Sequence, residues 1–371
     1  MKKTVFTMAL LILASLLLTG CLSLSTELSE RWIAGALGID YLAGQYEVTI
    51  LCFNTDLAEN ANATFDVAYI SGKGKDLHEA FLAARLSTAK KLFFGHNTVL
   101  VLGRALAEQR IYDTAVYLSQ NNETRLNITV FMSDGTAEEI IKLRTSDKAH
   151  ISGSLEKLAE SRPNGLDVKV QLFQLMQSMP DSGIEGFLPV LDTVELPGGE
   201  AEDGEKDEKL HDVSINKIAV FHGSALLGEA ADDIMTGIFL IKNRVETLDI
   251  TVQADSDTRC YGVLLRANTQ ITVTGKDEFV AELTLKGSVS VRGKSDFGSD
   301  AGLDEIKTKF EAEAERYLMK AYGYMKDRLK IDFFDTQWYA AAHTSQQAAG
   351  RYYAAGNIPK ATVSCSFGII G

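Results

Sequence analysis

The amino terminus constrains this chain most, because it decides which residues can belong to the folded body. Lys2 and Lys3 precede an apolar run from Val5 to Leu18. This run is shorter than the roughly 20 residues that a helix needs to cross a bilayer. A basic start followed by a short apolar run is typical of a signal peptide, so residues 1–20 should be removed from the mature protein.

Four residues at the end of this run predict a lipid anchor: Leu18, Thr19, Gly20 and Cys21. They resemble a bacterial lipobox, which implies cleavage after Gly20 and a diacylglyceryl group on the Cys21 sulfur. Residues 21–30 are rich in Ser and should form a lipidated tether. Acyl chains on Cys21 would hold the protein in membrane lipid, on the outer face of the cytoplasmic membrane. The alternative interpretation is a signal peptide with an incidental Cys.

The balance of charge bears on which partners such a protein can bind. Of its 371 residues, 37 are Lys or Arg and 50 are Asp or Glu, which gives a formal net charge of −13. A chain this acidic is repelled by nucleic-acid phosphates and by anionic lipid headgroups. We therefore expect no nucleic-acid partner.

Hydrophobic periodicity predicts an α+β (mixed α/β) fold. Thr98 to Leu102 is apolar after its first residue, which is typical of a fully buried strand. Apolar and polar residues alternate from Phe279 to Val291, which predicts a long strand with one solvent-facing side. An apolar stripe at helical spacing from Leu303 to Leu329 predicts a long helix across that sheet. Gly72 to Lys75 should be a loop before a helix that Asp76 caps.

The clearest division of the chain is the acidic segment 198–212. Up to residue 209 it contains no apolar side chain larger than Ala, so it cannot bury enough surface to order itself. It predicts a linker between an N-terminal α/β domain, 31–146, and a C-terminal α+β domain, 213–371. The stretch 147–197 is either a small second domain or an appendage of the first, and the sequence leaves both open.

Motifs that carry catalysis are incomplete in this sequence. Gly293-Lys294-Ser295 lacks the glycine spacing of a phosphate-binding loop, and Ser-x-x-Lys occurs without the other motifs of a serine acyl-enzyme. Six histidines are scattered, and Cys52, Cys260 and Cys365 lack the spacing of a zinc site, so we expect buried free thiols. We expect no enzyme, no metal and no cofactor other than the covalent lipid on Cys21.

The most specific motifs lie between residues 92 and 141. They are Leu92-Phe93-Phe94-Gly95-His96, Val99-Leu100-Val101-Leu102-Gly103, Leu106-Ala107, Glu123-x-Arg125 and Gly135-Thr136-Ala137-Glu138-Glu139-Ile140-Ile141. Their order and spacing resemble the C subunits of spore germinant receptors, the Ger(x)C lipoprotein family. Gly38-Ile39-Asp40 and a late Asp332-x-Phe334 with Trp338 also fit that pattern. The chain departs from it at Arg104, where the family usually has an acidic residue, and at Asn122, where an aspartate is expected.

This resemblance implies three domains, each a β-sheet flanked by helices, with no known catalytic activity. It implies a subunit of a nutrient (germinant) receptor at the spore inner membrane, beside an A-type subunit and a transporter-like B-type subunit. The alternative is a lipid-anchored solute-binding protein of an uptake system, which also suits an anchored chain of several domains.

Five residues of these motifs are candidates for a structural or docking role: Phe94, Gly95, His96, Glu123 and Arg125. Gly95 should serve the backbone geometry before a strand. His96 should be a polar group at the start of that strand, with a pH or ligand sensor as the alternative. Glu123 and Arg125 should form a local ion pair or cap, with partner docking as the alternative.

Overall fold

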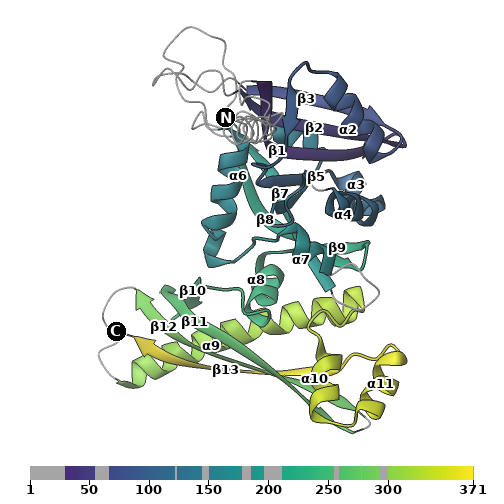
Figure 1. Ribbon diagram of the computed structural model, residues 1–371. Coiled ribbons are helices and arrows are strands. Elements are labelled where there is room, and N and C mark those ends of the chain that lie inside the picture. Colours follow the sequence, from purple (N-terminus) through teal and green to yellow (C-terminus); the bar gives the residue numbers. More distant parts are fainter. Residues whose placement is uncertain are drawn as a thin grey trace, which may run out of the picture.

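The structure is a computed structural model that describes residues 30–54, 67–121, 123–143, 150–177, 185–195, 211–254, 259–276, 278–292 and 300–370. Its helices and two sheets confirm the predicted α+β class. Figure 1 shows a first unit above, built on one sheet, and a second unit below, built on the other. The resemblance implied three sheet domains, whereas the described residues form two sheets.

The first sheet has nine strands. Eight follow one another across it, in the order β3 (Val67–Gly74), β2 (Gln45–Asn54), β1 (Arg31–Leu42), β5 (Val99–Leu102), β6 (Thr129–Ser133), β7 (Glu185–Glu195), β8 (His211–His222) and β9 (Ala225–Ala231), and β4 (Lys91–Phe93) pairs with the start of β1. The middle strands run parallel, and antiparallel strands complete both edges. Strands β5 and β6 are fully buried, so both of their faces are covered.

Short helices cover this sheet. They are α2 (Leu77–Leu86), α3 (Arg104–Gln109), α4 (Ile111–Gln120), α5 (Ala137–Ile141), α6 (Ile151–Glu160), the 3₁₀ turn η2 (Pro163–Gly165) and α7 (Leu172–Gln177). The Asp76 carboxylate accepts a hydrogen bond from the N–H of Glu79 at 2.8 Å, which confirms the predicted cap of α2. The β1–β2 hairpin turns at Ala43 and Gly44, whose φ angles of 50° and 81° suit a tight two-residue turn.

The acidic segment does not separate the two sheets. Strand β7 precedes it and β8 follows it, and the two pair antiparallel along their whole lengths. The second sheet begins at Thr247, so strands β8 and β9, which follow the predicted start of the C-terminal domain at residue 213, belong to the first sheet. A segment too polar to fold can join two neighbouring strands as readily as two domains. Residues 196–210 themselves lie outside the described residues.

The stretch 147–197 belongs to the first unit. Its strand β7 pairs with β6 through Met132–Val190 and Ser133–Leu191. Its helix α6 packs on β1 and β5. Of the two possibilities that the sequence leaves open, the described part of this stretch is therefore an appendage of the first sheet.

The second sheet has the order β10 (Thr247–Gln253), β11 (Arg259–Gly275), β12 (Phe279–Arg292) and β13 (Lys360–Ile370). Helix α9 (Asp300–Gly323) lies across it and continues as a π-helical turn, η3 (Tyr324–Leu329). The predicted stripe is confirmed at Ile306, Phe310, Ala314 and Ala321, which are buried. Helices α10 (Thr336–His343) and α11 (Gln346–Ala354) precede the last strand.

Helix α9 also shields the edge of this sheet. Glu315 accepts a hydrogen bond from the N–H of Cys365 at 3.1 Å, and Glu311 accepts one from the N–H of Phe367 at 2.8 Å. An uncovered edge strand leaves such N–H groups free to pair with a strand of another molecule, which promotes aggregation. Two carboxylates one helical turn apart therefore protect β13 from unwanted pairing.

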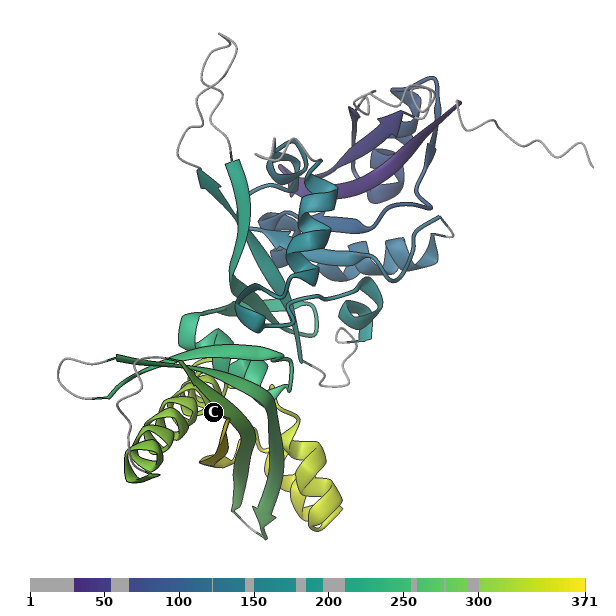
Figure 2. The same ribbon diagram turned by 90° about the vertical axis from the view of Figure 1, so that its left-hand side faces the viewer.

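Helix α8 (Asp232–Ile241) connects the two units (Figure 2). Its Phe239 ring packs edge-on against Phe187 of β7, with ring centres 5.2 Å apart. Just after α8, the Arg244 guanidinium lies 5.0 Å from the same Phe187 ring. A β-bridge between Leu166 and Val245 adds a backbone contact. The two units are thus held by packing as well as by the chain.

The expected loop at Gly72 to Lys75 is instead the end of strand β3, up to Gly74. A Cβ atom on Gly72 would lie 2.2 Å from the carbonyl oxygen of Ala80 and 2.3 Å from the nitrogen of Ala84. Glycine is needed there because helix α2 lies directly on the strand. The sequence alone suggests a loop because the contact that requires glycine is made with a later element.

We predict that Gly72→Ala destabilises the protein by about 1–3 kcal/mol or more, because backbone atoms of α2 would have to move. Urea unfolding measures the change. Gly153→Ala is the matched control, since a Cβ there meets nothing within 4 Å and helix α6 should gain up to about 1 kcal/mol. Equal stability of Gly72→Ala and the parent protein would contradict the packing described here.

Candidate functional site

The carboxyl ends of three parallel strands meet at one edge of the first sheet. Ile39 of β1 lies beside Leu102 of β5, which lies beside Met132 of β6. Asp40, Gly103-Arg104 and Asp134 follow these residues in the chain. In open α/β sheets, ligands bind at this kind of edge, so it is the first place to look for a functional site.

Asp40 is buried at this edge, with 3% of its surface exposed. Its carboxylate accepts hydrogen bonds from the N–H groups of Ala137 at 2.8 Å and Glu138 at 3.0 Å, in the first turn of α5. Gly103 permits this approach, because a Cβ there would lie 1.9 Å from Asp40 Oδ1. Burial raises the pKa of Asp40, and the two backbone hydrogen bonds oppose that rise. Both oxygens are occupied, so Asp40 is a helix cap and not a free base.

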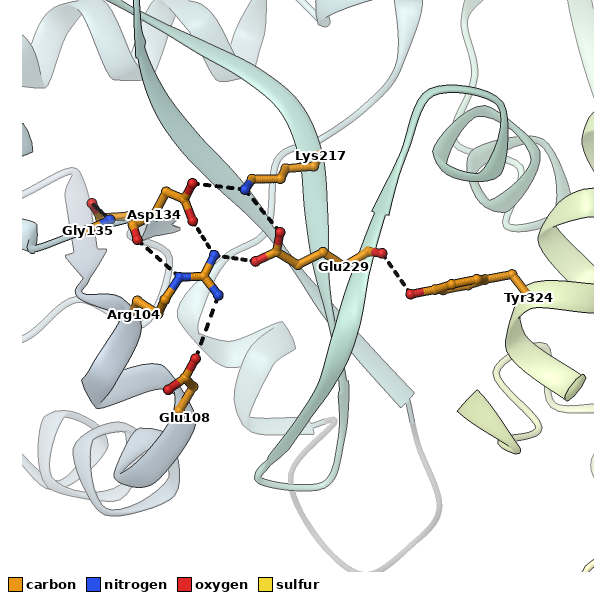
Figure 3. Close-up of polar contacts among 8 residues, drawn as sticks. Arg104, Glu108, Asp134, Gly135, Lys217, Glu229 and Tyr324 are labelled. Carbon is orange, nitrogen blue, oxygen red and sulfur yellow. Dashed lines mark hydrogen bonds and ion pairs between the residues drawn. The ribbon is translucent and has the colours of Figure 1, made fainter. Parts of the chain in front are cut away.

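Arg104 joins the end of β5 to three other elements (Figure 3). Its N–H donates to the carbonyl of Gly135, and its Nε donates to the carbonyl of Asp134, both at 3.0 Å. Its guanidinium also contacts the carboxylates of Asp134 and of Glu229 on β9. Glu108 lies 3.6 Å away, one turn along α3.

Lys217 on β8 completes this group. Its Nζ lies 3.0 Å from Asp134 Oδ2 and 3.0 Å from Glu229 Oε2. Hydrogen bonds from Arg104 and from Lys217 lower the pKa of Asp134. Arg104, Asp134, Lys217 and Glu229 are hereafter called the edge cluster. Each of its carboxylates contacts both of its cations, so no acid or base is left available for proton transfer.

The edge cluster also reaches the second unit. The Tyr324 hydroxyl, in the π-helical turn η3, donates to the carbonyl of Glu229 at 2.7 Å (Figure 3). The neighbouring Gly228 makes room for this contact, because a Cβ there would lie 2.9 Å from the same hydroxyl. Glu229 therefore binds the first unit through its side chain and the second unit through its backbone.

A hollow of about 690 Å³ lies between the β8–β9 hairpin and the second unit, and it is lined by Leu227, Asp332 and Trp338 among others. Asp332 accepts hydrogen bonds from the N–H groups of Thr336 at 2.9 Å and Gln337 at 2.8 Å, so it caps α10. Across the part of the chain that the structure describes, no cluster of His, Cys, Asp and Glu is arranged to hold a metal ion. In the same ranges, no helix is both long and apolar enough to cross a bilayer.

Two family models match this chain. One, described as the spore germination protein N-terminal domain, matches residues 25–193, and the other, described as spore germination B3/GerAC like, C-terminal, matches residues 216–364. Together they span most of the sequence. The chain belongs to this spore germination family. The two matches divide at the acidic segment, although the strands on its two sides share one sheet.

Individual relatives agree with this membership. The chain is 24% identical over 263 residues to the Bacillus subtilis (strain 168) protein YfkR, which is named as a spore germination protein. That match covers 68% of this chain and 65% of YfkR, slightly less than two thirds of the relative's length. The crystal structure of the GerBC protein aligns with a TM-score of 0.54 over 90% of this chain and 97% of its own, at 13% identity. This likeness shows a shared fold.

The residues that we expected to matter within the germination family lie away from the edge cluster. Phe94 is buried against Phe81, with ring centres 5.8 Å apart, and His96 is exposed beside Phe93. A Cβ on Gly95 would lie 2.4 Å from the ring of Phe93. Phe94, Gly95 and His96 directly follow β4, which pairs with the start of β1 at the amino-terminal side of the sheet. The lipobox residues and Cys21 lie outside the described residues.

The expected ion pair between Glu123 and Arg125 is wrong. Glu123 pairs with Arg85 of α2 at 2.9 Å, and both side chains are nearly half exposed. Arg125 is exposed in the connection from α4 to β6. Residues two apart in an irregular connection need not face each other, whereas α2 and α4 lie side by side over a hollow of about 410 Å³.

Sequence reasoning missed Lys217 and Glu229 altogether. Glu229 lies 125 residues beyond Arg104 in the chain, and neither residue belongs to a motif. Arg104 drew attention only as a departure from the expected family pattern. The structure places the carboxylates of Asp134 and Glu229 beside this cation.

We predict that Arg104→Ala destabilises this germination-family protein by about 1–2 kcal/mol, because it leaves Asp134 and Glu229 with Lys217 alone. The loss should be largest near neutral pH. The pKa of Asp134 is lowered on folding, so its stabilising effect is present above the unfolded value of 3.8 and is lost as the pH falls below it.

Urea unfolding at pH 7 and at about pH 3 measures both effects. Arg85→Ala is the matched control, since it removes an exposed pair and should change stability by no more than about 0.5 kcal/mol. An equal loss in the two variants, or a loss at Arg104 that does not depend on pH, would contradict a stabilising edge cluster.

Proposed function

We propose that this protein is a non-enzymatic, lipid-anchored C-type subunit of a spore germinant receptor. It acts in germination through contacts with A-type and B-type membrane subunits. The observation that carries the proposal is the match of both halves of the chain to spore germination family models. A family resemblance alone does not fix a role, so each part of the proposal needs its own support.

The lipid anchor is supported by the lipobox that ends in Cys21. A thiol at the first mature position accepts a diacylglyceryl group, and two acyl chains hold a protein at a bilayer more stably than one. The protein would then lie on the outer face of the cytoplasmic membrane, which in a spore is the inner membrane. This placement brings it beside polytopic receptor subunits.

A role without catalysis is supported by the state of the polar groups at the sheet edge. Both oxygens of Asp40 bind the first turn of α5, and the edge cluster neutralises its own charges. Catalysis needs a group that can exchange a proton or attack a substrate. These groups instead hold elements together, which suits a protein that works through its surfaces.

The alternative of a solute-binding protein predicts a cleft between two similar domains. The two units differ, because one has a nine-stranded sheet with parallel middle strands and the other has a four-stranded, mostly antiparallel sheet. The receptor subunit is therefore the function that we propose.

We predict that the lipidated protein co-purifies with an A-type and a B-type subunit from detergent-solubilised spore membranes. Mass spectrometry of the captured complex identifies the companions. Cys21→Ala is the control, and it should abolish acyl labelling and reduce both companions, because the protein would no longer be concentrated at the membrane.

Capture of an ABC permease in place of those subunits would contradict the receptor role and favour solute binding. Capture of the lipidated protein alone, under conditions that keep other receptor complexes intact, would also contradict it.

A further inference from the structure

One end of the first sheet differs in chemistry from the rest of this acidic protein. We define the tip as residues 30–33, 52–54 and 86–96. Here the first three residues of β1 pair with β4 on one side, and Trp32 and Ile33 pair with the end of β2 on the other. Strand β5 joins β1 only from Ala36 onward, so the tip extends beyond the middle of the sheet. In both ribbon views it lies far from the second unit (Figures 1 and 2).

Aromatic rings at the tip carry cations on their faces. The Lys90 ammonium lies 5.4 Å from the centre of a Trp32 ring, and the Arg31 guanidinium lies 5.4 Å from the centre of Phe93. The Trp32 indole N–H donates to the Thr88 hydroxyl at 3.0 Å, which fixes the ring. Trp and Tyr with neighbouring basic residues are typical of the membrane–water interface, because one part of each side chain is apolar and the other is wet.

The tip also exposes an apolar side chain. Leu86, the last residue of α2, is 77% exposed, more than any other large hydrophobic side chain in the described ranges. Lys91 is exposed as well. Long basic side chains can keep their charges in a headgroup layer while neighbouring apolar groups enter the lipid.

The described residues of the tip are basic, although the chain as a whole is acidic. Among the tip residues that the structure describes are three cations, Arg31, Lys90 and Lys91, and one carboxylate, Glu30, whereas the formal net charge of the chain is −13. An acidic body is repelled by anionic lipid, so a locally basic end would be turned toward such a surface and the body away from it.

The position of the tip in the chain matches this chemistry. Arg31 is ten positions after Cys21, and a fully extended chain spans at most about 3.6 Å per residue, or about 36 Å. A lipid on Cys21 would therefore keep the tip near the headgroups. The second unit is joined to the far side of the same sheet and has no such restriction.

We propose that the tip is a membrane-binding surface that contacts anionic phospholipid headgroups and sets the orientation of the protein on the bilayer. The proposal rests on the lipid anchor of the proposed function. Trp32 and Leu86 would enter the interface, and Arg31, Lys90 and Lys91 would contact the headgroups. The second unit would then project from the membrane.

The chain offers its own reporters, because it has two tryptophans, Trp32 at the tip and Trp338 on α10 of the second unit. Trp338 is 66% exposed, so Trp338→Phe should fold normally and leave Trp32 as the reporter. Trp32→Phe leaves Trp338 as the matched control. Each lipidated variant is incorporated into vesicles of phosphatidylcholine and phosphatidylglycerol whose acyl chains are brominated near the headgroup.

We expect Trp32 fluorescence to be quenched by the brominated lipid and Trp338 fluorescence to be unchanged. Lys90→Gln with Lys91→Gln should reduce the quenching of Trp32. The same change of charge at the exposed Lys286 and Lys360 of the second unit should leave it unchanged. Flotation of the vesicles shows separately whether the protein is anchored.

Failure to float would overturn the lipid anchor, which belongs to the proposed function. Flotation with Trp32 unquenched would overturn the tip proposal while leaving the anchor in place. Quenching of both tryptophans, or quenching that both lysine pairs reduce equally, would overturn the proposed orientation.

Discussion

Glu229 is the residue on which the arrangement of this protein most depends. Its carboxylate lies between Arg104 and Lys217, and its carbonyl accepts a hydrogen bond from the hydroxyl of Tyr324. Glu229 therefore connects three parts of the molecule: the end of β5, the β8–β9 hairpin of the first sheet and the π-helical turn of the second unit. π-Helical turns inside α-helices often mark functional positions, and this one occurs where the two units meet.

The carboxyl edge of a parallel sheet often binds ligands, but here its polar groups bind one another. Gly103 lets Asp40 reach α5, and the edge cluster fills the space beyond it with paired charges. Buried and half-buried ion pairs give modest net stability but fix the position of the elements that carry them. The ion pairs of the edge cluster therefore fix the positions of β5, β8 and β9 relative to one another.

Much of the fold could be predicted from local pattern, and the rest depends on contacts between distant residues. The β1–β2 hairpin, the cap at Asp76 and the apolar stripe of α9 follow from spacing and turn chemistry that act over a few residues. The role of Gly72 and the pairing of β7 with β8 could not be predicted in this way. Each depends on a contact with a later segment of the chain, and nothing in the local sequence identifies that segment. At this sheet edge, Asp40 and Arg104 lie in or beside a sequence motif, whereas Lys217 and Glu229 belong to no motif.

The central claim is that this chain works in germination as a membrane-bound subunit, and nutrient-triggered germination of spores tests it most directly. Spores whose native gene encodes the Cys21→Ala form should respond to the nutrient much more slowly than parent spores, with the protein absent from the inner-membrane fraction. Loss of refractility with time measures the response. A full nutrient response from spores whose protein is present but no longer membrane-bound would contradict the account.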